Sequence, residues 1–351
     1  MKTLKTLRRS TMASAISFVA ASAAFANSSV PIDVGDGTTI NLPSDRPLKV
    51  AFFIEGTNNS AMQATLDGAV KTAAQFGWKM DVFDAKWDAI VQTNQMQNAL
   101  SRGYDAWFLR AAEGSTVCDI ATEQAVSNNI LVVTGTLPIC GRSVNEGDEQ
   151  WAPGTLSYVG GTQSGDAWVE LLENMAKENP GPQKLGIVTG PELNPITRNF
   201  EIGLGRFLKK HPEIQVVAKA RTDYSTPVAY EKSIPMIQAN PDISLYFSSY
   251  GNLTKGLVTA LKELDRLKSV KVYEGGATTW SKQAILDGEL QSSSMLTVRT
   301  NSVKALEALR DAQQGKPVPR FIANDGLPIT KGKLLQILDT SNISQFEPEA
   351  Q

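Results

Sequence analysis

The stretch 48-LKVAFFIEGTNNSAMQ-63 joins a run of apolar residues to a cluster of small polar ones. An apolar run of this kind is typical of a strand buried on both faces of a parallel sheet, and the following residues show helical periodicity. Gly56 permits a tight turn between the two, and Asn59 or Ser60 caps the helix. In open parallel sheets, ligands bind outside the carboxyl ends of the strands. The polar cluster that begins at Glu55 is therefore a candidate ligand contact.

The same alternation of strand and helix continues along most of the chain. Apolar runs such as "WKMDVFDA", "YDAWFLRA" and "ILVVTGT" are separated by helical segments, a spacing that predicts right-handed βαβ units. After Gly160-Gly161 the pattern starts again with "KLGIVTG", "IQVVAKA", "SLYFSSYG" and "VKVYEGG". The sequence predicts an α/β protein with two doubly wound parallel-sheet halves, and 351 residues suffice for two cores. The tail "NISQFEPEAQ" is expected to fray.

Residues 1–26 have the features of a secretory signal peptide. Four basic residues precede the run "MASAISFVAASAAFA", which ends in a small-residue cleavage motif. The run is interrupted by serine and is shorter than the about 20 apolar residues that a membrane-spanning helix needs. We therefore expect cleavage after Ala26 and a periplasmic location for the mature protein.

The composition of the mature chain argues against several classes of function. The 34 basic residues of the full chain fall to 30 without the signal peptide, against 36 acidic residues, so the mature net charge is near −6. This balance argues against a nucleic-acid partner. The single histidine, His211, precedes a proline at a predicted helix end, so neither a metal site nor a histidine-centred catalytic site is expected. We expect no cofactor.

The predicted strands are not followed by enzyme motifs. "EGTNNS" lacks the Gly-x-Gly-x-x-Gly pattern of a dinucleotide site, and "GLGRF" at 203–207 lies within a predicted helix. Neither Gly-x-Ser-x-Gly nor His-Glu-x-x-His occurs in the sequence. We therefore predict a binding protein and not an enzyme.

A succession of segments, among them "DGAVKTAAQFGWKMDVFDA", "SNNILVVTGT", "YVGGTQSG", "GLVTALKEL" and "AILDGELQ", points to a family through its order and spacing. From residue 47 to 325 the chain resembles the type I periplasmic binding proteins of the ribose-binding group, the sugar-capturing subunits of ABC importers. The resemblance implies capture of a small polar ligand and its delivery to the membrane subunits of an importer. The alternatives are a sensor of the same fold that signals to a membrane histidine kinase, and a binder of a non-sugar solute that is cationic or aromatic.

The resemblance also implies two lobes that are each discontinuous in sequence. The first lobe comprises residues 47–160 and 298–322, and the second comprises residues 161–297 and 323–345. Three hinge crossings are expected, near Gly160-Gly161, near Leu296-Thr297 and near residues 322–325. The protein is expected to act as a monomer.

The family's ligand contacts, carried over by position, fall at the polar ends of the predicted strands. In the first lobe they are Glu55, Thr57, Asn58, Glu113 and Thr136. In the second lobe they are Arg198, Tyr224, Tyr250, Glu274 and Gly276. Among these, Arg198 matches an arginine of the family, and Tyr224 matches an aromatic residue that packs on a sugar ring.

Several candidate residues have an alternative role that the sequence leaves open. Glu55 and Glu274 also fit solvated strand ends, and Arg198 also fits a salt bridge between the lobes. Trp280 is a further aromatic candidate that also suits the core of the helix it begins, and Trp151 also suits the anchoring of its own loop.

Four positions depart from the sugar-binding pattern of the family. Thr136-Leu137 replaces an Asp-Arg pair, Tyr250 replaces an asparagine, Gly275 or Gly276 replaces an aspartate, and Leu296 or Thr297 replaces a glutamine. Each buried hydroxyl left without a partner costs on the order of 1–3 kcal/mol, which argues against ribose itself. Carboxylates and aromatic rings suit either a sugar or a caged cation. Because Arg198 would repel a cation, we predict a neutral sugar derivative or polyol.

Two cysteines in an exported chain favour a disulfide. Cys118 lies in the first turn of the helix after the third strand, and Cys140 follows the fourth strand. Both positions belong to the same edge of the first lobe's sheet. We therefore predict a disulfide between them that holds the loop "ICGRSVNEGDEQWAPG" near the cleft.

Overall fold

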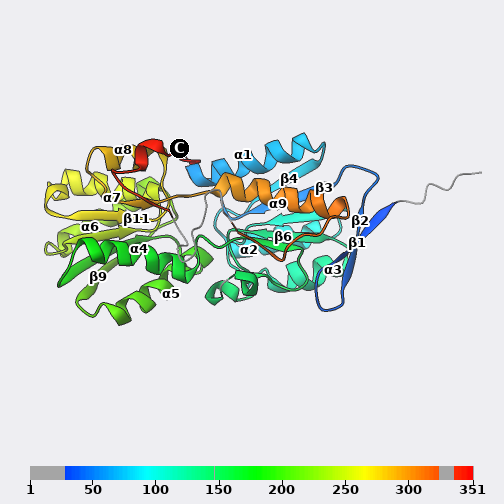
Figure 1. Cartoon of the computed structure of the whole chain (residues 1–351), viewed down its shortest axis with the longest axis horizontal. Helices are drawn as coiled ribbons and strands as arrows, with labels where there is room; N and C mark the ends of the chain where they lie inside the picture. The colour runs from blue at the N-terminus through cyan, green and yellow to red at the C-terminus, as the bar shows by residue number, and fades with distance from the viewer. Residues whose placement is uncertain (1–27, 146, 324–335, 351) are drawn as a thin grey trace, which may run out of the picture.

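The structure, a computed structural model, describes residues 28–145, 147–323 and 336–350. In these ranges the chain forms two α/β lobes that lie side by side along the long axis of the molecule (Figure 1). The predicted signal peptide, residues 1–26, lies outside the described residues. No helix in the described ranges combines the length and apolar character needed to cross a membrane.

The first lobe is built on a six-stranded parallel sheet in the order β13-β7-β6-β5-β3-β4. The side chains from Val50 to Ile54 in β3 are fully buried, as the continuous apolar run predicts. The strands are β3 (Lys49–Ile54), β4 (Lys79–Asp84), β5 (Ala106–Leu109), β6 (Leu131–Gly135), β7 (Ser157–Gly160) and β13 (Phe321–Ala323). The helices are α1 (Ser60–Gln75), α2 (Ala89–Ala99), α3 (Ala125–Ser127) and α9 (Val298–Gln313), with short helical turns η2 (Arg142–Val144) and η3 (Gly147–Gln150).

The first helix begins where the polar cluster predicts. The Asn59 side chain accepts a hydrogen bond from the Met62 amide at 3.0 Å, which satisfies one free amide of the first turn. α9 returns from the second lobe and packs along α1 (Figure 1). The two helices cover one face of the six-stranded sheet, and α9 thereby belongs to the first lobe although it follows the second in sequence.

The second lobe repeats the arrangement around a four-stranded parallel sheet in the order β11-β10-β8-β9. One side of this sheet packs on a cluster of aromatic rings in which Phe200 stacks on Phe247 and meets Trp168 edge-on. The strands are β8 (Gln183–Thr189), β9 (Ile214–Arg221), β10 (Leu245–Ser248) and β11 (Lys271–Glu274). The helices are α4 (Gly165–Glu178), α5 (Pro195–Lys210), α6 (Thr226–Ala239), α7 (Gly251–Glu263) and α8 (Thr279–Leu286), with the short turn η4 (Leu267–Ser269).

Two connections carry the chain between the lobes within the described residues. The first runs from β7 to α4, past Gly161, which has a φ of 105°. The second runs from β12 (Ser293–Ser294) to α9. β12 pairs with β14 (Ile337–Leu338) in a small antiparallel sheet. The third crossing, expected at residues 322–325, runs into residues 324–335, which lie outside the described residues.

A hairpin that precedes the βαβ units was not part of the sequence-based prediction. β1 (Ser29–Asp33) and β2 (Thr39–Pro43) pair in antiparallel fashion. The turn uses positive φ angles at Gly35, Asp36 and Gly37. Figure 1 shows the hairpin at the end of the first lobe that faces away from the second. It therefore extends the first lobe without approaching the interlobe region.

The predicted helix after β5 forms without a break over residues 118–127, and it contains a π-helical turn η1 (Ile120–Gln124) that continues into the short α3. One local expectation is wrong. The tail predicted to fray is packed, because Ile343, Phe346 and Ala350 are 0%, 8% and 0% exposed against the second lobe. The sparse apolar residues of the tail, and not its many polar ones, decide its structure. A turn η5 (Ile343–Gln345) lies within it.

The predicted disulfide is confirmed. Cys118 and Cys140 are bonded, with their Cα atoms 4.8 Å apart and a separation of 22 positions in the sequence. Cys118 precedes η1 and Cys140 follows β6, so the bond ties two loops at the carboxyl edge of the first lobe's sheet. Those loops form one wall of the interlobe region.

Replacing both cysteines with alanine should lower the free energy of unfolding by about 3 kcal/mol, because the bond restricts the unfolded chain. Urea unfolding followed by circular dichroism measures the loss. Unfolded, unreduced wild-type protein should not react with a thiol reagent. Two reactive thiols in that sample would show that the bond does not form.

Candidate functional site

The carboxyl ends of strands from both lobes face each other across the interlobe region. A small cavity, called the inner cavity here, lies between them. Its lining comes from the loops after β3, β4, β5, β7, β8, β9 and β10 and from the second crossing. The lining residues are Asn59, Ala61, Met62, Trp87, Arg110, Gln163, Ile196, Tyr224, Ser249, Tyr250, Leu296 and Val298.

A buried ion pair forms the floor of the inner cavity on the first-lobe side. Arg110 Nε donates to Glu55 Oε2 at 2.9 Å, and Arg110 Nη2 donates to Glu55 Oε1 at 2.6 Å. The two side chains are 1% and 0% exposed. The bidentate geometry is the strong form of this interaction. The structure thus pairs Glu55, a predicted ligand contact, with an arginine that the sequence analysis does not select.

Two further side chains complete this network. Arg110 Nη1 donates to Thr136 Oγ1 at 2.8 Å, and Asn301 Nδ2 donates to the same oxygen at 2.7 Å. Thr136 has a φ of 63°, an unfavourable backbone conformation for a β-branched residue. Such conformations persist only where the surroundings enforce them, and they cluster at binding and catalytic sites. Thr136 therefore holds Arg110 in place below the cavity.

Aromatic rings from opposite lobes meet above the ion pair. Trp87 follows β4 and Tyr224 follows β9, and their ring centroids are 4.9 Å apart. Each has a φ of 64°, so both loops hold their rings in a strained conformation. Trp87 Nε1 also donates to Asn58 Oδ1 at 2.7 Å. The pair provides flat apolar surfaces at the position where the lobes meet.

A tyrosine of the second lobe reaches the first helix of the first lobe. Tyr250 Oη accepts a hydrogen bond from the Ala61 amide at 2.8 Å and lies 3.1 Å from Ser60 Oγ. Burial raises the pKa of Tyr250, and likewise that of Tyr224, so both phenols remain neutral. Asn58 Nδ2 makes another contact between the lobes, to the carbonyl of Asp223 at 3.4 Å. The lobes are therefore in the closed arrangement.

Two polar atoms that line the inner cavity lack a hydrogen-bond partner among the described residues. They are Ser249 Oγ, on a side chain that is 2% exposed, and Gln163 Oε1. Buried polar atoms in native proteins are nearly always paired, so each exception needs an explanation. In this closed arrangement the cavity measures about 30 Å³, room for about one water molecule, so a larger hydroxylated ligand that pairs with both atoms needs the lobes to stand further apart.

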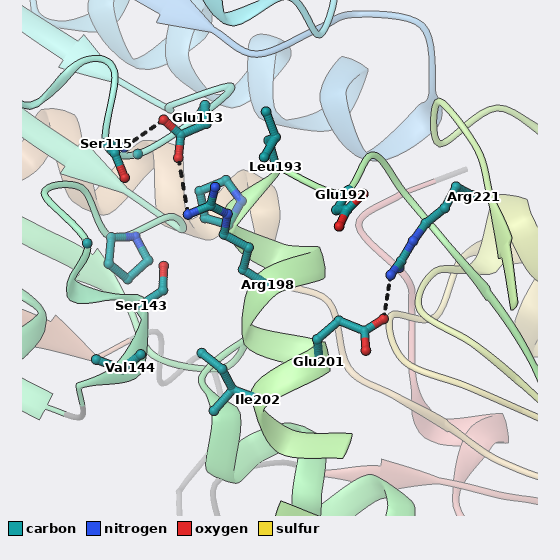
Figure 2. Close-up of a pocket in the computed structure, with 14 residues that line it drawn as sticks. Glu113, Ser115, Ser143, Val144, Glu192, Leu193, Arg198, Glu201, Ile202 and Arg221 are labelled. Carbon is teal, nitrogen blue, oxygen red and sulfur yellow. Dashed lines mark hydrogen bonds and ion pairs between the residues drawn. The ribbon is translucent and has the colours of Figure 1, made fainter. Parts of the chain in front are cut away.

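A larger cavity of about 510 Å³, the outer cavity, lies at the mouth of the interlobe region. Figure 2 shows Arg198 of α5 pointing toward Glu113, which follows β5. Glu113 Oε1 lies 3.6 Å from Arg198 Nη1, while its Oε2 accepts the amides of Ser115 and Thr116. On the opposite side, Arg221 pairs with Glu201 of α5 at 2.6 Å. The predicted contacts Glu113 and Arg198 thus both lie in the outer cavity.

The remaining predicted residues are distributed around the two cavities. Thr57 donates to Asp84 Oδ2 at 2.6 Å within the first lobe. Gly276, with a φ of 104°, packs next to the Tyr250 ring. A Cβ added at this glycine would lie 3.5 Å from the ring. Neither residue is part of the lining of the inner or outer cavity. The structure therefore brings together Tyr224 and Tyr250 at the inner cavity, and Glu113 and Arg198 at the outer one.

Glu274 lies in the interior of the second lobe, at the end of β11. Ser293 Oγ donates to its Oε1 at 2.7 Å, and Oε2 has no hydrogen-bond partner in the described part of the chain. Burial raises the pKa of this carboxyl group to about 7, because desolvation outweighs the nearby hydroxyl groups. The structure places Glu274 under the cavity-lining loops and not on the cavity surface.

Of the residues that line the inner cavity, the sequence-based selection of ligand contacts includes only Tyr224 and Tyr250. Trp87, Arg110, Gln163 and Ser249 are among those that it missed. For Arg110 a signal was present, because it directly follows the buried strand "AWFL" just as Glu55 follows "AFFI". Ser249 similarly follows β10. For Trp87 and Gln163 the sequence holds no such signal, since loop conformation brings them to the cavity. In the described ranges no cluster of three or more His, Cys, Asp or Glu side chains has the arrangement of a metal site.

A two-lobed α/β clamp, with a cavity between its lobes that is lined by aromatic and apolar side chains and a few polar ones, defines a class of ligand-binding proteins. The periplasmic binding protein domain family matches residues 50–327 of the chain. The chain therefore belongs to this family of substrate-binding proteins, which implies a periplasmic location and a binding function without catalysis.

Individual relatives agree with this assignment. The chain is 22% identical over 283 residues to the ribose import binding protein RbsB of Bacillus subtilis, covering 81% of this chain and 87% of the relative. It is 23% identical over 247 residues to the D-apiose import binding protein of Actinobacillus succinogenes, covering 70% and 76%.

Solved structures share the fold. An ABC transporter solute-binding protein from Mycobacterium smegmatis with bound glycerol has a TM-score of 0.72 at 21% identity, over 87% of this chain and 99% of that one. The myo-inositol binding protein of Caulobacter has a TM-score of 0.74 at 14% identity, over 87% and 97%. The predicted type I periplasmic binding protein fold is thereby confirmed.

Replacing Arg110 with methionine should lower the free energy of unfolding by about 3–5 kcal/mol, because it leaves the Glu55 carboxylate buried without a partner. Urea unfolding at pH 7 measures the loss. Arg198→Met is the matched control, and its long, partly exposed contact should contribute less than about 1 kcal/mol. Adding Glu55→Gln to Arg110→Met should recover part of the loss. Equal losses in the two single variants would show that the buried pair has no special role.

The buried carboxyl of Glu274 should make stability depend on pH. Its folded-state pKa of about 7 lies above the ordinary value of 4.5, so the folded protein holds this proton more tightly than the unfolded chain. The resulting stabilisation is complete below the ordinary pKa and is lost as the pH rises through 7. Between pH 5 and pH 8, wild type should lose about 2.5 kcal/mol relative to Glu274→Gln.

Urea unfolding of both proteins at the two pH values tests this dependence. Glu347→Gln, which changes a carboxylate whose side chain is 88% exposed, should keep the wild-type pH profile. Parallel pH profiles for wild type and Glu274→Gln would show that the carboxyl group of Glu274 titrates normally.

Proposed function

We propose that the protein captures a sugar, a sugar derivative or a polyol in the inner cavity and delivers it to an ABC importer. The observation that carries the proposal is the pair of unpartnered polar atoms, Ser249 Oγ and Gln163 Oε1, beside the tilted aromatic rings of Trp87 and Tyr224. Such rings suit the apolar faces of a sugar ring, while polar atoms between them suit its hydroxyl groups. The cavity thus offers partners for both the apolar faces and the hydroxyl groups of a carbohydrate.

The electrostatics of the inner cavity favour a neutral ligand. Glu55 and Arg110 neutralise each other at the floor, and both are buried. A cationic ligand would face Arg110, and an anionic ligand would compete with Glu55 for the same guanidinium group. Either would leave a buried charge without a partner, which costs several kcal/mol by order of magnitude. A neutral hydroxylated ligand avoids that cost.

The relatives support the same ligand class. Two are import binding proteins for ribose and D-apiose, and solved structures of the fold hold glycerol, D-arabinose and myo-inositol. All five ligands are neutral and rich in hydroxyl groups. The exact ligand of this chain is expected to differ from ribose, because Thr136, Tyr250 and Gly276 replace polar residues of the ribose-binding pattern.

The lobes act as a clamp around this ligand. The first lobe comprises residues 47–160 and 298–322, and the second comprises residues 161–297 and 323–345. Arg198 and Glu113, on opposite lobes, close the mouth after the ligand enters. The mature protein, cleaved after Ala26, works in the periplasm as a monomer, and the membrane subunits of the importer recognise its closed form.

Replacing Ser249 with alanine should weaken binding by about 0.5–1.5 kcal/mol, the value of one neutral hydrogen bond. The ligand is first found by a thermal-shift screen of the mature protein against sugars, polyols and amines. A ligand at a hundred times its dissociation constant stabilises the protein by about 2.7 kcal/mol. Calorimetric titration of wild type and variant then gives the two affinities.

Ser233→Ala is the matched control for this experiment. Ser233 Oγ is also buried and without a partner in the described part of the chain, but it lies on α6, away from both cavities. Its replacement should leave the affinity unchanged. A quaternary amine as the tightest ligand, or equal affinities for wild type and Ser249→Ala, would contradict the proposal.

A further inference from the structure

The end of the chain lies beyond the part that matches the family, which stops at residue 327. Residues 336–350 are attached to the second lobe. β14 pairs with β12, the Thr279 amide donates to the Ala350 carbonyl at 2.9 Å, and Lys282 Nζ donates to the Phe346 carbonyl at 2.6 Å. Because Phe346 and Ala350 are also buried there, the segment is held firmly against α8.

One side chain of this segment reaches toward the other lobe. The Glu349 carboxylate accepts hydrogen bonds from the Arg299 amide at 2.7 Å and the Thr300 amide at 3.3 Å, and also from the Thr300 hydroxyl. These amides belong to the first turn of α9. The helix has no side-chain cap of its own at Thr297 and no acidic residue in its first turn. Glu349 therefore supplies the missing cap.

The first turn of α9 moves with the first lobe. The Arg299 guanidinium pairs with Asp67 of α1, whose other oxygen pairs with Lys71 at 2.7 Å. Gly68 allows this close approach, since an added Cβ would lie 2.9 Å from the Arg299 carbonyl oxygen. The two helices pack along each other (Figure 1). A carboxylate anchored on the second lobe thus caps a helix anchored on the first.

We infer that the C-terminal segment is an interlobe strap that stabilises the closed state through Glu349. When the lobes separate, the carboxylate leaves the start of α9, and water replaces it at the free amides. Loss of a helix cap of this kind changes an equilibrium by about fivefold, equivalent to about 1 kcal/mol. The strap lies outside both cavities, so it sets the open-to-closed ratio for any ligand, and the inference does not depend on which ligand binds.

The open-to-closed ratio of ligand-free protein tests the strap. Spin labels on cysteines introduced at the exposed positions Ser127 and Lys209 report the distance between the lobes, and the native cysteines do not react because they are paired. Glu349→Ala should increase the ratio of open to closed molecules about fivefold. Glu347→Ala removes a neighbouring carboxylate that pairs only within the second lobe, with Lys282, and should leave the ratio unchanged.

Two further measurements keep the inference testable if Glu349→Ala is poorly folded. Glu349→Gln preserves the size of the side chain and should shift the ratio in the same direction by a smaller factor. Hydrogen exchange of the Arg299 and Thr300 amides should be faster in both Glu349 variants than in Glu347→Ala. If the Arg299 and Thr300 amides exchange faster but the spin-label distances between the lobes do not change, the inference is overturned. Glu349 would then cap α9 without affecting the open-to-closed ratio.

Discussion

The buried ion pair between Glu55 and Arg110 is the constraint on which the interlobe site depends. Two opposite charges without access to water are tolerated only in favourable geometry, with their other hydrogen-bonding groups satisfied. Here the geometry is bidentate, and Thr136 accepts from the remaining guanidinium nitrogen. These residues follow β3, β5 and β6, three adjacent strands of one sheet. The pair therefore fixes the relative position of three loops and leaves the floor of the cavity neutral.

The second lobe approaches this floor with a different kind of surface. Tyr224, Tyr250 and Ser249 supply two neutral phenols and one free hydroxyl, and the contacts between the lobes combine the ring pair Trp87–Tyr224 with hydrogen bonds from Asn58 and to Tyr250. Relative motion of two domains is expected unless their interface is large and hydrophobic. The closed arrangement thus depends partly on contacts that a ligand adds. It also depends on two contacts at the edge of the interlobe region, between Glu113 and Arg198 and between Glu349 and the start of α9. Affinity in such a clamp reflects both the cavity and the ease of closure.

The sequence predicted the fold well because βαβ units have a strong local signature. The buried run before Glu55, the cap at Asn59 and the two cysteines all describe local structure or sheet edges, and the structure agrees. The partner of Glu55 was beyond this reasoning. Arg110 is 55 residues away and becomes its neighbour only because β5 lies next to β3. Pairing of that kind depends on strand order and side-chain direction.

Loop conformation limited the prediction of the site in a second way. Trp87 reaches the cavity through a residue with positive φ, which sequence periodicity does not reveal. Family positions placed Glu113 and Arg198 correctly on the facing edges of the lobes, yet both line the outer cavity. The tail was misjudged because three buried apolar residues, Ile343, Phe346 and Ala350, leave a weak signal among many polar ones.

A crystal structure with the tightest-binding sugar or polyol from the screen is the most direct test of an interlobe carbohydrate site. We predict a ligand ring against Trp87 or Tyr224, hydroxyl groups within hydrogen-bond distance of Ser249 Oγ and Gln163 Oε1, and an intact ion pair between Glu55 and Arg110. A ligand seated only in the outer cavity, with Ser249 and Gln163 still unpartnered, would contradict it.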